Sequence, residues 1–232
     1  MLIVTHIPKT AGTTLRVFLW RHIKEERRFA VHGDIVGDMA FLLHDPTEVA
    51  RLEVLFGHIC YGWHEALDIR KPEYVTILRD PVIRAGSLFD FASKYEGHYL
   101  YSRTRYMSFQ KFMSSGVTRT ADNAMVRQLC GVDRFLREPE RDMVIPFGEV
   151  TKDHLEMAKE NLRSYFLVGI SERYQNFQNA LSTKMGWPLY LQEFWNPRHV
   201  GRRTNIEKDR RWAEDFLSLD CKLYEFAKGL AP

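Results

Sequence analysis

LIVTHIPKTAGTTL, residues 2–15, reads in order as a strand, a tight turn and the start of a helix. Leu2–Ile7 is rich in β-branched side chains, which predicts a short buried strand. Pro8–Gly12 interrupts it, and from Thr13 onward apolar residues recur on one helical face, at Leu15, Phe18, Leu19 and Ile23. A strand that feeds a helix through a short glycine-containing turn is the first unit of many parallel sheets.

The rest of the chain repeats this alternation. Further strands are predicted at Phe29–His32, Val54–Ile59, Tyr74–Leu78 and Phe166–Ile170. Helices are predicted after Pro81, over Leu155–Arg163, after an N-cap at Ser171, and as one long final helix over Glu207–Lys228. This order predicts an α/β fold in which a central parallel sheet of about five strands is flanked by helices. No repeat or linker divides residues 1–232, so we expect one domain.

Composition sets loose limits. The chain has 232 residues, 45% of them hydrophobic, and a formal charge of +3, which is too mild to indicate a nucleic-acid partner but suits an anionic ligand. Cys60, Cys130 and Cys221 show no metal-ligand spacing, so we expect free thiols in a reducing compartment, and hence a cytoplasmic protein. No apolar run reaches the roughly 18 residues of a membrane span, so no stable membrane insertion is expected. An upstream anchor and the oligomeric state are left open.

The turn after the first strand has the residues of an anion site. A helix N-terminus offers unpaired N–H groups and a partial positive charge. Gly12 allows close backbone approach, Thr13 and Thr14 add hydroxyl groups, and Lys9 adds a full charge. Lys9 precedes the glycine, so the turn is not the GxxxxGK[ST] loop of ATP- and GTP-binding proteins. An ordinary turn with a surface lysine is the alternative.

A second candidate anion site follows the predicted strand Tyr74–Leu78. Arg79 ends that strand, and Ser87 lies eight residues later, about two turns along the next helix. An arginine with a hydroxyl suits a phosphate monoester. The alternative is that Arg79 pairs with Asp80 or a helix end and Ser87 only packs. Two basic sites at neighbouring strand ends fit a nucleotide with separate 5′ and 3′ phosphates.

HIPKTAGTTL resembles the 5′-phosphosulfate-binding loop of sulfotransferases that use 3′-phosphoadenosine 5′-phosphosulfate (PAPS). It is most similar to the branch of heparan sulfate 2-O-sulfotransferase and the bacterial family-2 sulfotransferases. The resemblance implies a three-layer P-loop-type fold, with Lys9 at the bridging oxygen of the donor. The nucleotide-binding residues implied by this and later motifs are Lys9, Thr10, Ala11, Gly12, Thr13, Thr14, Arg79, Ser87, Arg202, Arg203 and Thr204.

His58, after Gly57 at the end of the third predicted strand, matches the position of a histidine in that family. Histidine titrates near neutral pH and can accept the proton of an attacking hydroxyl, so His58 is the candidate base. The alternative is a neutral histidine packed at a strand end. The alternative candidates for the base are His32, His64 and Glu65. His6 is interpreted as a core or supporting residue.

Two further residues lie in segments that resemble the family. Arg127 could face an acidic acceptor, support the nucleotide or form a structural ion pair, and the sequence leaves these open. Glu172, after the last predicted strand, is expected to be structural.

The sequence therefore predicts an enzyme that moves a sulfuryl group from PAPS to a hydroxyl of a carbohydrate or small molecule, in line and without a metal. PAP is the expected product, and no nucleic-acid partner is expected. The alternatives are an ATP- and Mg²⁺-dependent phosphotransferase and a non-catalytic PAP-binding protein.

Overall fold

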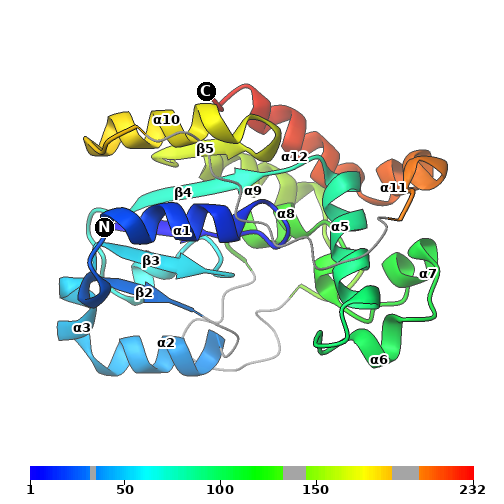
Figure 1. Cartoon of the computed structure of the whole chain (residues 1–232), viewed down its shortest axis with the longest axis horizontal. Coiled ribbons are helices and arrows are strands. Elements are labelled where there is room, and N and C mark those ends of the chain that lie inside the picture. Colours follow the sequence, from blue (N-terminus) through cyan, green and yellow to red (C-terminus); the bar gives the residue numbers. More distant parts are fainter. Residues whose placement is uncertain (32–34, 133–144, 190–203) are drawn as a thin grey trace.

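The computed structural model describes residues 1–31, 35–132, 145–189 and 204–232. Its centre is a five-stranded sheet in the order β2-β3-β1-β4-β5, and every pair of neighbouring strands is parallel (Figure 1). This confirms the predicted α/β architecture. The strands are β1 (Leu2–Thr5), β2 (Arg28–Ala30), β3 (Val54–Gly57), β4 (Glu73–Leu78) and β5 (Leu167–Ile170).

Helices cover both faces of this sheet. They are α1 (Gly12–His22), α2 (Ile35–His44), α3 (Pro46–Arg51), α4 (Trp63–Ala66), α5 (Pro81–Lys94), α6 (Tyr101–Thr104), α7 (Phe109–Ser114), α8 (Ala124–Leu129), α9 (Lys152–Arg163), α10 (Tyr174–Met185), α11 (Arg210–Phe216) and α12 (Ser218–Lys228). Among the described residues, none of these helices has both the length and the apolar character needed to cross a bilayer.

The alternation of side chains along β1 explains the layers. Leu2 and Val4 point to one face, where they pack with α1 and α10, and Ile3 points to the other, where it packs with α2, α8, α9 and α12. A third apolar cluster joins α5, α7 and α11. Because β1 lies in the middle, the loop that follows it lies between the ends of β3 and β4.

The final helix departs from the prediction. Instead of one helix over Glu207–Lys228, a 3₁₀ turn at Glu207–Asp209 is followed by α11 and α12, with a break at Leu217. The backbone N–H of Asp220 donates to the side chain of Asn123 at 2.9 Å, so it is taken from the helical hydrogen-bond ladder. A contact between residues far apart in sequence therefore interrupts the helix.

The predicted N-cap at Ser171 was also wrong. Ser171–Arg173 forms a 3₁₀ turn, and α10 begins only at Tyr174 without a side-chain cap. The first strand is shorter than predicted, because β1 ends at Thr5 and His6 and Ile7 belong to the loop.

Gly169 in β5 is a site where we expect a stability effect. A Cβ at this position would lie 2.3 Å from Cδ2 of Phe177, a buried ring of α10. Gly169→Ala should therefore cost about 1–3 kcal/mol by overpacking, and lower the melting temperature by about 2–4 °C for each kcal/mol. Gly229→Ala is the control, because its nearest neighbour is 3.4 Å away. Equal melting temperatures for the two variants would contradict the expectation.

Candidate functional site

The loop between β1 and α1 has an unusual backbone. Lys9 and Ala11 both adopt the left-handed region, with φ of 72° and 71°, although neither is glycine. When left-handed residues alternate with a right-handed one, the successive N–H groups point to the same side of the chain. They form a concavity that binds anions. Ala11 is the N-cap of α1, no side chain caps this helix, and its first turn carries no acidic residue. The N-terminal turn of α1 is therefore suited to an anion.

The threonines of this loop have different surroundings. The Thr10 hydroxyl donates to the carbonyl oxygen of Ile7 at 2.8 Å and is buried, so it braces the loop from within. Thr14 is also buried, whereas Thr13 is exposed and lines a small pocket. Among the three, Thr13 has the hydroxyl most accessible to a ligand.

Lys9 and Arg79, the cations of the two predicted anion sites, lie together. The Arg79 guanidinium donates from Nη1 to the Lys9 carbonyl oxygen at 3.0 Å. The Lys9 ammonium lies 4.1 Å from the centre of the Phe91 ring. Burial, followed by repulsion from Arg79, lowers the pKa of Lys9, and Asp90 opposes this. Within the described residues no carboxylate forms an ion pair with Lys9, so the electrostatics favour a bound anion near it.

Of the remaining residues predicted to bind the nucleotide, Ser87 lies on α5 and Thr204 lies against it. Ser87 is half-buried on this helix. The Thr204 hydroxyl donates to Asp90 at 2.6 Å and accepts from Lys94 at 2.9 Å, which fastens Thr204 to α5. Arg202 and Arg203 lie outside the described residues. The structure thus places Thr204 next to α5, the helix that carries Ser87. The Thr204 hydroxyl is already hydrogen-bonded to Asp90 and Lys94.

His58 has the geometry of a base. Its Nδ1 lies 2.7 Å from the carbonyl oxygen of His6. Because a carbonyl can only accept, Nδ1 carries the proton, and the neutral ring keeps its lone pair on Nε2. Protein surrounds most of the ring although one edge is exposed, and this burial lowers the pKa of His58 against the opposing effect of the hydrogen bond. His58 is therefore neutral near pH 7.

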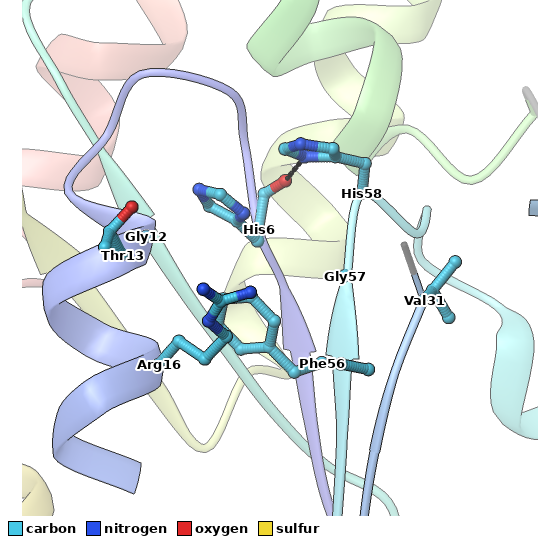
Figure 2. A pocket seen from close by; sticks show the side chains of 9 residues that line it. His6, Gly12, Thr13, Arg16, Val31, Phe56, Gly57 and His58 are labelled. Carbon is cyan, nitrogen blue, oxygen red and sulfur yellow. Dashed lines mark hydrogen bonds between the residues drawn. The ribbon is translucent and has the colours of Figure 1, made fainter. Parts of the chain in front are cut away.

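His6, interpreted from the sequence as a core or supporting residue, also lines a pocket. The His6 ring stacks on the His58 ring, with centres 4.5 Å apart and planes at 26°. Both rings line a pocket of about 170 Å³, together with Gly12, Thr13 and Arg16 (Figure 2). Among the described residues that line it, none carries a carboxylate. Arg16, one helical turn after Gly12 and Thr13, could have been found from its spacing.

A larger cavity of about 940 Å³ also borders His58. His58 and Val31 line both cavities. The walls of the larger one carry aromatic and basic side chains, among them Phe91, His98, Tyr99 and Arg119. This cavity has room for an acceptor molecule whose hydroxyl reaches His58.

The alternative candidates for the base are placed less favourably. The Tyr74 hydroxyl accepts the Gly62 N–H at 3.0 Å and lies 2.9 Å from Nδ1 of His64. The Tyr74 hydroxyl also accepts the backbone N–H of His64 at 3.3 Å, so both of its lone pairs are used and its own proton goes to Nδ1 of His64. This bond occupies the lone pair on that nitrogen. Glu65 is exposed on α4. His32 lies outside the described residues.

Arg127 and Glu172 have structural partners. Arg127 is buried and forms an ion pair with Asp122 at 2.5 Å, and it donates to the carbonyl oxygens of Ile145 and Pro146. Of the three roles left open for Arg127, the structure shows the ion pair, and Arg127 also lines the larger cavity. Glu172 accepts the N–H of Asp80 and the hydroxyl of Tyr224, both at 3.1 Å, as expected for a structural residue.

Comparisons with known proteins give little. No protein-family model and no curated protein matches the chain. Among solved structures, it is similar to mouse sulfotransferase SULT7A1 complexed with PAP, with 11% identity and a TM-score of 0.48. That match covers 82% of this chain, which spans only 60% of the length of the mouse chain. The function proposed below therefore rests on the geometry of the site.

Proposed function

We propose that this chain transfers a sulfuryl group from PAPS to an acceptor hydroxyl. The observation that carries the proposal is the contact between the two predicted anion sites, in which Arg79 holds the carbonyl of Lys9 at 3.0 Å. One nucleotide with a phosphate at each end can therefore reach both sites. The fit is also chemical, because this region combines a concave loop, an uncapped helix N-terminus and two cations.

When bound, PAPS supplies an activated sulfuryl group on its 5′-phosphate. The loop N–H groups and Thr13 would hold that phosphate, and Arg79 with Ser87 would hold the 3′-phosphate. His58 takes the acceptor proton on Nε2 while the acceptor oxygen bonds to sulfur. The bond between sulfur and the bridging oxygen of PAPS would break, and Lys9 would stabilise the negative charge that develops on that oxygen. The electron pair of the broken bond would stay on the oxygen, which leaves as part of PAP. No covalent intermediate with the chain is needed.

The acceptor belongs in the larger cavity beside His58, and we propose a carbohydrate or small-molecule hydroxyl. The resemblance to the branch of heparan sulfate 2-O-sulfotransferase rests on the sequence motifs alone. A cytoplasmic location is part of the same proposal, supported by three cysteines that are all free thiols.

Calorimetric titration tests the nucleotide part of the proposal. PAP should bind without added metal, and ATP with Mg²⁺ should bind much more weakly, because the loop lacks the lysine position of ATP-binding loops. Tight metal-dependent ATP binding with no PAP binding would instead support a phosphotransferase. PAP binding without transfer to any of a panel of hydroxyl acceptors would support a non-catalytic binding protein.

Ser87→Ala is expected to weaken PAP selectively. Loss of one hydrogen bond to a charged group costs about 1.5–3 kcal/mol, or roughly a 10- to 100-fold loss of affinity. Adenosine 5′-phosphosulfate lacks the 3′-phosphate and should bind the variant almost normally. Arg79→Ala should weaken both ligands, because Arg79 also holds the Lys9 carbonyl. Calorimetry of both ligands on both variants checks this, and equal losses in Ser87→Ala would contradict it.

A further inference from the structure

The His6 side chain lies between the anion-binding loop and His58. On one side its ring stacks on the His58 ring at 4.5 Å. On the other side it occupies the space next to Gly12, where an added Cβ would lie 1.7 Å from the His6 Nε2 and 2.1 Å from its Cε1. Figure 2 shows the ring between the start of α1 and His58. One side chain thus fills the space between the loop and the candidate base.

The His6 backbone supports the same arrangement. Its carbonyl oxygen accepts from His58 Nδ1 at 2.7 Å and from the Gln128 side chain at 3.0 Å. Gln128 donates also to the carbonyl of Ile59 at 2.9 Å, so it ties the His6 carbonyl to the segment that follows His58. Among the described residues, the His6 ring itself makes ring contacts with His58 and Phe56 and no hydrogen bond.

The surroundings of the His6 ring favour its neutral form. Burial, followed by repulsion from any positive charge on His58, Arg16 or Lys9, lowers the pKa of His6 well below its usual value. A neutral His6 ring can stack against a neutral His58 ring without charge repulsion. The His6 ring therefore acts through its shape and position.

We propose that His6 is a positioning residue for His58, whose ring fills the gap between Gly12 and His58 and so fixes the base relative to the anion-binding loop. The same arrangement gives Gly12 a second role, which is to leave space for the His6 ring. A residue with a Cβ at position 12 would collide with that ring. The description of His58 as a base rests on the proposed function. The first two tests below read stability and tautomer, so they can fail while sulfuryl transfer holds, and the reverse.

The first test is a double-mutant cycle on stability with Gly12→Ala and His6→Ala. Gly12→Ala alone should lower the melting temperature strongly, because the His6 ring is in the way. In the His6→Ala background the same change should cost little. If Gly12→Ala alone does not fold, recovery of folded protein in the double variant supports the proposal. An equal cost in both backgrounds, or no recovery, overturns it.

The second test is the tautomer of His58, read from imidazole ¹⁵N chemical shifts above its pKa. The protein should show the proton on Nδ1. His6→Ala should give a mixture of the two tautomers, because the ring can turn away from the His6 carbonyl. His6→Phe keeps a flat ring and should keep the Nδ1–H form, as should the control His44→Ala, an exposed histidine of α2. An unchanged tautomer in His6→Ala overturns the proposal.

Activity gives a third readout for the same variants. If His6 acts by position, His6→Phe should retain much more transfer than His6→Ala. If His6 carries a proton in the reaction, His6→Phe, which has no ring nitrogen, should lose transfer as completely as His6→Ala. That second result would overturn the positioning role.

Discussion

Lys9→Ala is expected to reduce the turnover number by about 10²–10³-fold, the usual effect of removing one group that stabilises transition-state charge. Lys9 is suited to this role because it is half-buried and forms no ion pair with a carboxylate among the described residues. In a poorly hydrated site a charge acts more strongly on a developing negative charge than it would in water. PAP affinity should fall by less than the turnover number.

Steady-state kinetics and PAP calorimetry on the same protein preparation check this prediction. Lys24→Ala is the matched control, because Lys24 is an exposed lysine just beyond α1. A turnover number within a few fold of the unmodified protein would remove Lys9 from the mechanism. A parallel loss of PAP affinity and turnover would assign Lys9 to nucleotide binding alone.

His58→Ala is expected to reduce transfer by about 10²–10⁴-fold, the contribution of a positioned general base. The structural reason is that His58 Nδ1 is bound to the His6 carbonyl, which leaves Nε2 as the proton acceptor. PAP affinity should change little. His58→Gln is a second variant, because its amide can still donate to the His6 carbonyl while it cannot act as a base. Both variants should therefore bind PAP and fail in transfer.

The pH dependence gives an independent check on His58. Burial lowers its pKa below the usual value of about 6.5, so turnover should stay level near neutral pH and fall only in more acidic solution. Residual turnover in His58→Ala should lack this acidic fall. A similar acidic fall in His58→Ala would show that another group is responsible.

Stability must be measured over the same pH range. The folded protein holds His6 and His58 with lowered pKa values, so the unfolded chain binds more protons below about 6.5. The stability they contribute is complete above that pH and is lost as the pH falls toward their folded values. Circular dichroism at each assay pH separates this loss from titration of the base.

Much of the fold was predictable because its signals are local. The β-branched runs fixed the strands, and helices between them required a parallel sheet, which brings the loops after β1, β3 and β4 to one edge. Lys9, Arg79 and His58 follow those strands. Their proximity therefore follows from the topology.

The surroundings of the site were less predictable because they depend on distant contacts. The predicted strand extended to Ile7 and put His6 inside the sheet, whereas β1 ends at Thr5 and leaves His6 free to reach the pocket. The ion pair of Arg127 depends on the carbonyls of Ile145 and Pro146 as much as on Asp122. No local pattern contains these contacts.

The left-handed conformations of Lys9 and Ala11 bear on the kinetics of the proposed nucleotide binding. Such backbone states cost about 1–3 kcal/mol each, and the packing of the whole domain supplies that energy before any ligand arrives. If the loop keeps this shape when an anion binds, association needs no rearrangement step. The capture rate would then be governed by diffusion and by attraction to Lys9 and Arg79, and it would decline as salt screens that attraction.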